Sequence, residues 1–395
     1  MHNNIHIGLF GFGVVGEGLF HVLENARNAN AVIEKICVKN KDKKRSLADH
    51  FFTLDKNEIL NDAKINLVVE LIDDADEAYT IVKQALNNGK SVVSGNKKML
   101  AYHLEELIQI QKEKNVALLY DASACGSIPV IRNLEEYYDN DLLQSVTGIL
   151  NGSSNYILSK IFNEQQDYAV ALKKAQELGF AESNPTFDVD GFDSLYKLII
   201  LTIHSFGLII NPDDVLNYGI SNVSKEDVQF AKEKGFKIKL TAQVSRINNE
   251  QISLFVLPKF VSPNEYIYNV ENEYNGVIIE GKFYEKQFMF GKGAGGFPTG
   301  SSVLSDITAR SHNYKYEYKK QKINGSLSYT TDHLLEIYLR YQNVVDLSLF
   351  EFEEISEKHV SNKYNYVIGK ITLKSILKLK HLLPKLNIFI VNTGN

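Results

Sequence analysis

The chain of 395 residues has little cysteine, little excess charge and no long apolar run. Its two cysteines, Cys37 and Cys125, are too few for a disulfide framework and are typical of a reducing compartment. The formal net charge of -5 provides no basic surface of the kind that binds nucleic acid or an anionic membrane. These absences favour a cytoplasmic protein whose partners are small molecules or other subunits.

No apolar run is long enough to cross a membrane, because such a helix needs about 18 to 20 residues. The longest apolar stretch, residues 198–210, is shorter and contains His204 and Ser205, so we expect a buried helix there. The first apolar stretch, residues 5–10, leads directly into a glycine-rich turn and leaves no room for a signal peptide. We therefore expect neither a membrane segment nor a secretion signal.

Short apolar runs alternate with helical patterns through the first third of the chain, which is typical of βαβ units around a parallel sheet. The expected strands are residues 5–10, 33–38, 67–72, 91–93 and 116–120. The expected helices are residues 76–88 and 101–114, where apolar residues recur at helical spacing. We predict that residues 1–125 form an α/β domain with a parallel sheet.

A glycine-rich turn follows the first expected strand directly and opens a helix. It has the form Gly-x-Gly-x-x-Gly, and its members are Gly11, Phe12, Gly13, Val14, Val15 and Gly16. Such glycines allow a tight turn and a close approach of the backbone to a pyrophosphate, while the helix N-terminus supplies amide donors. The position of this turn favours a Rossmann-type dinucleotide-binding domain over an ordinary loop.

The residues after the second expected strand indicate which dinucleotide would bind. An acidic residue there usually accepts the ribose hydroxyls of NAD, but this chain has Asn40 between two lysines. The surrounding cations are Lys39, Lys41, Lys43, Lys44 and Arg45. They favour the 2′-phosphate of NADP(H), whereas Asp42 and the alternative of a solvated charged loop leave NAD(H) open.

From about residue 146 the pattern changes to a second, α+β domain, which we place at residues 126–312. A strand is expected at residues 146–150, and further strands within residues 241–290, where β-branched and aromatic residues nearly alternate. Helices are expected at residues 155–162, 169–179 and 193–207. A linker and a small α+β tail at residues 330–395 complete the expected organisation.

Five segments in the same order resemble the homoserine dehydrogenase family. They are the glycine turn and residues 95–98 (Gly-Asn-Lys-Lys), 151–158 (Asn-Gly-Ser-Ser-Asn-Tyr-Ile-Leu), 175–193 and 291–299. The resemblance runs from about residue 5 to residue 307. It implies an NAD(P)H-dependent oxidoreductase that reversibly reduces L-aspartate 4-semialdehyde to L-homoserine in threonine and methionine biosynthesis.

The resemblance implies that Lys197 and Asp193 carry the catalysis, and their spacing of four places both on one face of a helix. When hydride adds to the aldehyde, negative charge grows on its oxygen. Lys197 can stabilise and protonate that oxygen while Asp193 orients the ammonium. The spacing alone would fit a surface salt bridge equally well.

The other expected site residues come from the resemblance alone. The implied substrate-binding residues are Glu182, Asp188, Lys97, Gly152 and Ser153, of which the last two could instead form only a helix N-cap. Beyond the glycine turn, the implied cofactor-binding residues are Lys39, Ser94, Lys97, Gly179 and Gly295. Oxygens of four residues are implied to hold a structural sodium ion: Asp121, Ala124, Gly126 and Ile128. Family members pair through the second domain, which implies a homodimer.

The chain departs from the family pattern at Asp73-Asp74, where two glycines are usual, so we expect a different local backbone there. Cys125 is interpreted as a small buried residue rather than a nucleophile, because no motif places a histidine beside it. Two further hypotheses remain: a related amino-acid or semialdehyde dehydrogenase with another substrate, and a nucleotide-binding regulatory protein without catalysis.

The tail is compared with a small threonine-binding domain of βαββαβ order that many relatives carry. Here strands are expected at residues 334–341, 347–352, 364–371 and 387–391, with a helix at residues 373–383. The resulting order is βββαβ, and the Asp-x-Pro-Gly turn that usually opens the first helix is absent. We predict a degenerate domain that packs against the body or a partner subunit and binds threonine weakly. An intact sensor whose strands are displaced by a few residues is the alternative.

Overall fold

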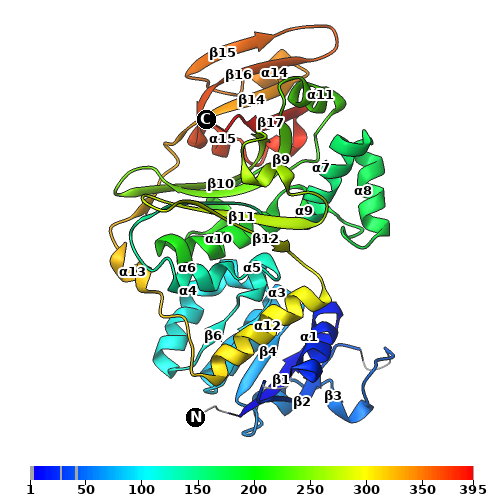
Figure 1. Cartoon of the computed structure of the whole chain (residues 1–395), viewed down its shortest axis with the longest axis vertical. Coiled ribbons are helices and arrows are strands. Elements are labelled where there is room, and N and C mark those ends of the chain that lie inside the picture. Colours follow the sequence, from blue (N-terminus) through cyan, green and yellow to red (C-terminus); the bar gives the residue numbers. More distant parts are fainter. Residues whose placement is uncertain (1–3, 27–28, 41–42, 395) are drawn as a thin grey trace. The chain divides into compact units, whose positions relative to one another are not determined.

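The structure is a computed structural model that describes residues 4–26, 29–40 and 43–394 (Figure 1). The chain forms two compact units, Met1–Asp139 with Lys292–Lys319, and Asn140–Gly291 with Lys320–Asn395. This division differs from the expected domains 1–125, 126–312 and 330–395. Residues 292–319 return to the first unit, and the tail shares the second unit with residues 140–291.

The first unit is built on a parallel sheet of six strands in the order β3-β2-β1-β4-β5-β6. This is the strand order of a Rossmann-type domain, as the sequence predicted. The strands are β1 (Ile5–Phe10), β2 (Ala31–Cys37), β3 (Phe52–Thr53), β4 (Leu67–Glu70), β5 (Ser91–Ser94) and β6 (Leu118–Leu119). β3 was not predicted, because two residues provide too short a pattern. β4 and β5 are buried along their whole length, as is usual for strands covered on both faces.

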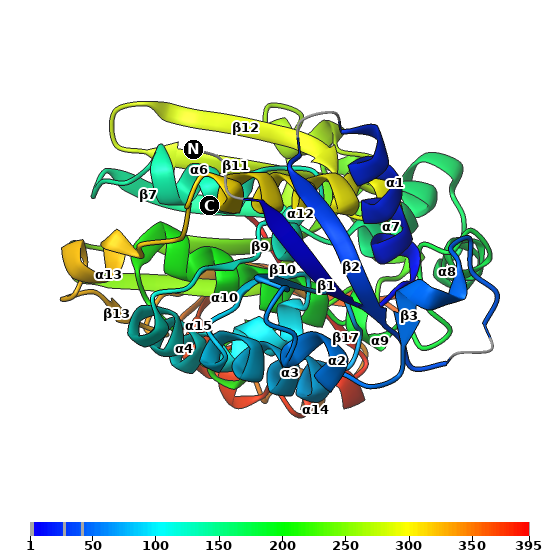
Figure 2. The same cartoon turned by 90° about the horizontal axis from the view of Figure 1, so that it is seen from below.

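Helices cover both faces of this sheet (Figure 2). On one face lie α1 (Val14–Asn25) and α12 (Gly296–Ser311), and on the other lie α3 (Ala75–Asn87) and α4 (Lys97–Lys114). Shorter helices are η1 (Asp49–Phe51), α2 (Asn57–Leu60), α5 (Ala122–Cys125), α6 (Val130–Glu136) and α13 (Lys319–Ile323), the last of which starts at the end of the unit. The α4 helix begins four residues before the predicted start, because the Asn96 side chain caps it by accepting from the amide of Met99.

Glycines allow α1 and α12 to cross at backbone contact. A Cβ atom on Gly18 would lie 2.2 Å from the main-chain oxygen of Gly296, and one on Gly300 would lie 2.7 Å from the amide nitrogen of Leu19. A larger side chain at either position would separate the helices. This contact explains why residues 292–319 belong to the first unit, although they follow the second in sequence.

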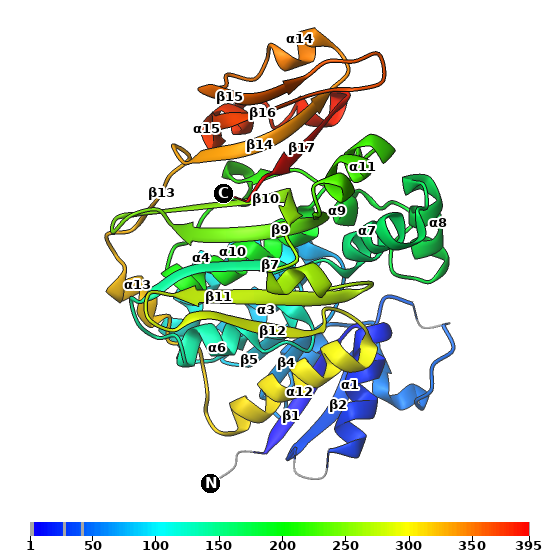
Figure 3. The same cartoon turned by 45° about the horizontal axis from the view of Figure 1, so that its top comes forward.

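A sheet of eleven strands organises the second unit (Figure 3). Its main path runs β12-β11-β7-β9-β10-β17-β14-β16-β15, and β8 and β13 both pair with β10. The strands before the tail are β7 (Leu143–Ile149), β8 (Leu216–Asn217), β9 (Lys237–Arg246), β10 (Gln251–Val261), β11 (Tyr274–Gly281), β12 (Glu285–Lys292) and β13 (Ser328–Tyr329). The helices are α7 (Gly152–Glu164), α8 (Tyr168–Glu177), α9 (Thr186–Val189), α10 (Phe192–Phe206), η2 (Pro212–Asp214), α11 (Lys225–Glu233) and η3 (Tyr266–Asn269).

The buried helix predicted near residue 200 is α10, in which every residue after Phe192 is buried. Gly191 and Gly207 flank it in the left-handed conformation, with φ of 84° and 78°. These glycines allow sharp chain reversals at both ends. No helix of the described residues is long and apolar enough to cross a membrane.

The tail has the order βαββαβ, so the predicted order βββαβ was wrong. Its elements are β14 (Leu334–Tyr341), α14 (Val344–Leu347), β15 (Glu354–His359), β16 (Asn365–Thr372), α15 (Leu373–Lys378), η4 (Leu383–Lys385) and β17 (Ile388–Asn392). The strand expected at residues 347–352 lies at Glu354–His359 instead. One helical turn, α14, precedes this strand. The sequence did not predict α14, because a single turn leaves little periodicity. The predicted helix ends at Lys378, five residues early.

The tail packs against the body of its own unit, as one form of the prediction stated. Lys259 of β10 pairs with Asn392 of β17, which makes the sheet continuous. A buried ion pair adds a second attachment, since Arg340 Nε lies 2.9 Å from Asp227 Oδ2. The hydroxyl of Tyr338 also donates to Asp227, at 2.9 Å.

Candidate active site

Both residues expected to act in catalysis lie in a buried cluster of the second unit. The α10 helix carries Asp193 and Lys197 one turn apart, and their side chains are 3% and 8% exposed. Lys197 Nζ donates to Asp193 Oδ2 at 2.8 Å and to the main-chain oxygen of Leu150 at 2.7 Å. Because both charges are buried, the alternative of a surface salt bridge is wrong.

Asn151, which the sequence analysis did not single out, connects this pair to Asp188. Its Nδ2 donates to Asp188 Oδ1 at 2.7 Å and to Asp193 Oδ2 at 2.9 Å. Its Oδ1 accepts from the amide of Ser154 at 2.7 Å, so Asn151 also caps α7. An asparagine before Gly-Ser-Ser is a recognisable N-cap pattern, but its contacts with two aspartates depend on the fold.

Gly152 and Ser153 form the first turn of α7, and Asn151 rather than either of them is the N-cap. A Cβ on Gly152 would lie 2.6 Å from the main-chain oxygen of Glu273. The hydroxyl of Ser153 donates to the main-chain oxygen of Phe180. These two positions therefore fix the backbone beside the cluster.

Glu182 and Gly179 also lie in the second unit, but on its surface. Glu182 is exposed, and its main-chain oxygen accepts from Gln176 Nε2 at 2.9 Å. Gly179 follows α8 with φ of 75°, where its amide donates to the main-chain oxygen of Gln176.

The glycine turn lies at the carboxyl end of β1, in the first unit. Gly13 is the N-cap of α1 and carries no side-chain cap, and a Cβ there would meet no atom within 4 Å. By contrast, a Cβ on Gly16 would lie 2.4 Å from the main-chain oxygen of Gly11. Gly13 thus leaves open space before the amides of the helix, which is the arrangement that a pyrophosphate needs.

A second glycine segment returns to this turn within the same unit. Gly295 is the N-cap of α12 with φ of 118°, and a Cβ on the next residue, Gly296, would lie 2.8 Å from the main-chain oxygen of Val14. The expected cofactor residue Gly295 is therefore brought close to the glycine turn.

Lys39 follows β2 and is exposed at 75% of its side chain, with Nζ 3.7 Å from Asp74 Oδ2. Asp74 also caps α3 by accepting from the amide of Glu77, and this hydrogen bond chiefly lowers its pKa. The unusual Asp73-Asp74 pair thus provides a helix cap and a partner for Lys39. Lys41 and Asp42 lie outside the described residues.

A buried carboxylate organises the ends of β4 and β5. Glu70 is fully buried and accepts from Ser94 Oγ at 2.6 Å and from the amide of Ile72 at 2.8 Å. Ser94 Oγ in turn accepts from the amide of Asn96, which caps the helix that Lys97 begins. Glu70 was not among the expected site residues, yet it positions both Ser94 and Lys97.

The four residues of the implied sodium site lie in one turn around α5. The main-chain oxygen of Asp121 accepts from the amide of Ala124 at 3.4 Å, and that of Ile128 accepts from the amide of Val130 at 2.8 Å. Gly126 has φ of 55°, and its Cβ would lie 2.6 Å from the main-chain oxygen of Lys292. Such a turn of carbonyls suits a hard cation. Among the described side chains, no group of three His, Cys, Asp or Glu could hold a metal ion.

The carboxylate and the amide of Asp121 both form hydrogen bonds within the protein. Its Oδ1 accepts from the amide of Arg132 at 3.1 Å, and the amide of Asp121 donates to Asp306 Oδ2 at 2.9 Å. Any contact of Asp121 with a cation would thus come most simply from its carbonyl. Cys125 is buried in the same turn, which agrees with its interpretation as a packing residue.

A glycine turn at the end of the first strand of a 3-2-1-4-5-6 parallel sheet, together with a buried lysine and carboxylate cluster, is typical of a dinucleotide-dependent oxidoreductase. Family models agree, because residues 11–121 match the NAD binding domain of homoserine dehydrogenase and residues 129–308 match homoserine dehydrogenase itself. The chain belongs to the homoserine dehydrogenase family.

Individual relatives agree with this assignment. A homoserine dehydrogenase from Lactococcus lactis is 36% identical over 314 residues, which cover 77% of this chain and 73% of the relative. A structure from Thiobacillus denitrificans covers 99% of this chain and 98% of its own, with a TM-score of 0.84 and 28% identity. One from S. aureus covers 100% of both, with a TM-score of 0.74 and 30% identity. The protein is thus an NAD(P)-dependent oxidoreductase of amino-acid biosynthesis that interconverts L-aspartate 4-semialdehyde and L-homoserine.

The burial of Glu70 predicts a pH-dependent stability. Desolvation raises the pKa of Glu70 from 4.5 to about 7, so the folded state holds this proton while the unfolded state releases it. Stability is fully present below pH 4.5 and is lost as the pH rises through 7, by on the order of 3 kcal/mol. In Glu70→Gln this loss should be absent.

Urea unfolding at pH 5 and pH 8 measures the effect as the change in the stability difference between the two proteins. The raised pKa of Asp306 acts in the same direction in both proteins and cancels. Equal pH dependence in the wild type and in Glu70→Gln would show that the carboxyl is ionised without penalty.

Proposed function

We propose that Lys197 donates the proton to the substrate oxygen in this homoserine dehydrogenase, with Asp193 orienting its ammonium. The observation that carries the proposal is the buried Nζ atom, held 2.8 Å from Asp193 Oδ2 and 2.7 Å from the oxygen of Leu150. These two contacts use two of its three N–H donors and direct the third. A preorganised cation in a dry site stabilises developing negative charge well.

The chemistry follows from where the charge develops. When bound, the nicotinamide cofactor supplies or accepts the hydride. Lys197 then provides a hydrogen bond and a proton to the aldehyde oxygen during reduction, and takes the proton back during oxidation. Asp193 keeps the ammonium in place and offsets its charge. Asn151 holds the two aspartates at a set separation by donating to both.

Substrate binding is proposed for residues that offer both signs of charge. Homoserine carries an ammonium and a carboxylate, so Asp188 and Glu182 would bind the former and Lys97 would lie near the latter or the nicotinamide. Gly152 and Ser153 would contact the substrate through the first turn of α7, whose backbone they fix.

NADP(H) is the proposed preferred cofactor, with NAD(H) as a second possibility. The glycine turn with Phe12, Val14 and Val15 would bind the pyrophosphate side. Further contacts are proposed for Lys39, Ser94, Lys97, Gly179 and Gly295. A similar archaeal homoserine dehydrogenase, with 26% identity and a TM-score of 0.68, is described in complex with NADPH. The exposed Lys39 supports the preference here.

A structural sodium ion is proposed at the main-chain oxygens of Asp121, Ala124, Gly126 and Ile128. Thermal unfolding in NaCl and in choline chloride of equal ionic strength tests it, and equal midpoints would contradict it. A homodimer is proposed through the second unit, where Phe290 of the edge strand β12 and Tyr266 of η3 are about half exposed. Sedimentation velocity measures the mass of the assembly.

A cytoplasmic location is also proposed, in keeping with two free cysteines. Fractionation of the source cell tests this location.

Replacing Lys197 by alanine should lower kcat by on the order of 10² to 10⁴ and leave the affinity for the cofactor nearly unchanged. The reason is that the ammonium acts on the substrate oxygen. Reduction of aspartate semialdehyde, followed by the loss of reduced nicotinamide absorbance, measures kcat, and cofactor titration measures affinity.

Lys173→Ala is the matched control, since Lys173 forms an exposed ion pair at the same spacing with Glu177. It should keep full activity. If Lys197→Ala retains more than about a tenth of wild-type turnover, which is only ~1.4 kcal/mol of barrier, the role given to Lys197 is wrong.

The ratio of kcat/KM for NADPH to that for NADH should exceed one and should fall several-fold in Lys39→Gln, because a charge-assisted contact with the 2′-phosphate is lost. Steady-state kinetics with both cofactors measures it. Lys114→Gln is the control. Lys114 is the last residue of α4, and its replacement should leave the ratio unchanged. Equal or higher efficiency with NADH in the wild type would reject the preference.

Threonine should inhibit weakly or not at all at millimolar concentration. The α14 helix has four residues and no side-chain cap, so it offers no developed N-terminal site for a carboxylate. Titration of threonine into the assay measures inhibition. Strong inhibition would show that the tail is an intact sensor despite its short helices.

A further inference from the structure

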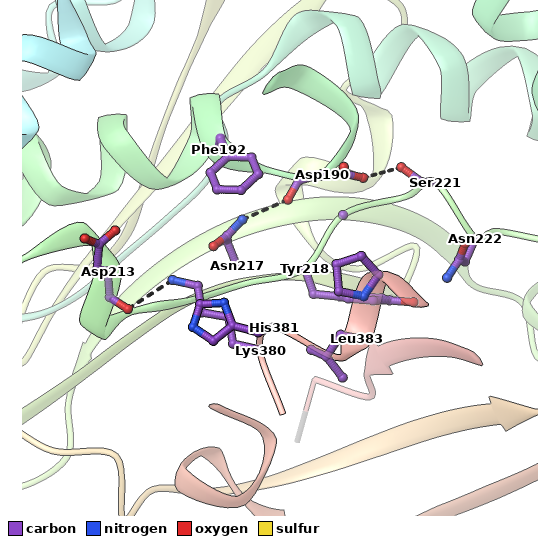
Figure 4. A pocket seen from close by; sticks show the side chains of 12 residues that line it. Asp190, Phe192, Asp213, Asn217, Tyr218, Ser221, Asn222, Lys380, His381 and Leu383 are labelled. Atoms are coloured by element: carbon purple, nitrogen blue, oxygen red, sulfur yellow. Dashed lines mark hydrogen bonds between the residues drawn. The ribbon is translucent and has the colours of Figure 1, made fainter. Parts of the chain in front are cut away.

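A cavity of about 660 Å³ lies in the second unit. We call it the tail cavity, and its walls include Asp190, Phe192, Asn217, Lys380, His381 and Leu383 (Figure 4). Its volume falls in the range of small-molecule sites. Neither Asp193 nor Lys197 lines it.

The tail cavity contains a buried polar atom that lacks a partner. Asn217 is 8% exposed, and its Nδ2 donates to the main-chain oxygen of Asp190 at 3.0 Å (Figure 4). Its Oδ1 is buried and accepts no hydrogen bond among the described residues. A buried acceptor of this kind costs roughly 1 to 3 kcal/mol unless a donor reaches it. A ligand that brings a donor to this oxygen would therefore gain a hydrogen bond that the chain does not supply.

Two carboxylates in the lining favour a donor that carries a positive charge. The Asp190 carboxylate lines the cavity and accepts from the hydroxyl of Ser221, and Asp213 lines it as well. The cation present, Lys380, already donates to main-chain oxygens of Pro212, Asp213 and Val215, the last at 2.6 Å. Burial lowers the pKa of Lys380. His381 is exposed at the rim.

Part of the remaining lining is apolar. Phe192 and Leu383 face the cavity, and the ring of Tyr218 lies with them while its hydroxyl donates to the main-chain oxygen of Ile388 at 3.0 Å. A ligand that fits both parts has an ammonium for Asn217 and Asp190 and a short apolar chain for these walls.

The tail cavity adjoins the start of the catalytic helix. Asp190 immediately precedes Gly191, the left-handed N-cap of α10, and Asp193 follows in its first turn. Asn217 holds the main-chain oxygen of Asp190, and the amide of Ile220 holds that of Val189 at 2.7 Å. A ligand on Asn217 and Asp190 would thus act directly on the turn that positions Asp193.

We propose that the tail cavity binds a small primary ammonium compound with a short apolar chain, and that the ligand modulates turnover through the turn at Asp190. The kinetic part rests on the role proposed for Asp193, whereas the binding part is independent of it.

The probes are n-pentylamine, 1-pentanol and pentanoate at pH 7.5, which share a chain length and differ in charge. Saturating L-homoserine without cofactor keeps the active site filled. Ligand-detected NMR and thermal unfolding of the full chain should show saturable binding of pentylammonium, at least fivefold weaker binding of pentanol and none of pentanoate. Equal binding of pentanol, or no saturable binding of pentylammonium, would overturn the proposal.

Two variants locate the site. Asp190→Asn keeps the shape and the contact with Ser221 but removes a charge, and it should weaken pentylammonium binding about tenfold. Asn217→Leu removes the acceptor and should do the same. Asp346→Asn, on α14, is the matched control and should bind like the wild type. Unchanged binding in a folded Asp190→Asn protein would place the ligand elsewhere and contradict the proposal.

Kinetics tests the modulation separately. Pentylammonium should change kcat in the wild type at saturating substrate and should have little effect on Asp190→Asn. Simple competition with homoserine would show that the probe acts in the active site, which would overturn the regulatory part. A failed role for Lys197 would leave the binding results unaffected, so the two failures can be distinguished.

Discussion

Two opposite charges inside a buried, mostly apolar helix, on Asp193 and Lys197, impose the main constraint on the second unit. A buried ion is costly unless partners replace the lost water. The rest of α10 is buried and mostly apolar, so those partners come from other elements. The oxygen of Leu150 and the amide of Asn151 supply them, from the segment between β7 and α7. The packing of three elements is thus tied to the hydrogen bonds of one ion pair.

The first unit also buries an acidic side chain, Glu70, whose hydrogen-bond partners come from the protein. Its carboxylate is buried at the end of β4, and the hydroxyl of Ser94 and the amide of Ile72 satisfy it. Through Ser94 and Asn96 the network reaches the first residue of α4, Lys97. In both units a buried acid at the end of a regular element therefore fixes the backbone beside a lysine for which we propose a role in the active site.

Local patterns predicted many elements of the fold. Residues 5–10 form the strand that was expected, because a short, mostly apolar segment before a glycine turn leaves few alternatives. The predictions failed where an element is too short to leave a period, as for α14 and β3. In the tail, the apolar run at residues 347–352 suggested a strand, yet the strand that pairs with β16 comes after it, at Glu354–His359. Pairing with a partner strand, rather than local apolarity, selects the register there.

The Rossmann-type turn, the shared helical face of Asp193 and Lys197, and the family were all recognisable from the sequence alone. These depend on residues that are neighbours along the chain. Three features were visible only in the tertiary structure: the burial of Asp193 and Lys197, the link from Asp188 to Asp193 through Asn151, and the return of α12 to α1. Asn151 lies 37 and 42 residues from those aspartates, and Gly18 meets Gly296 at backbone distance. Such contacts form only when remote segments pack together, because neither their hydrogen bonds nor their close approach leaves a pattern in the local sequence.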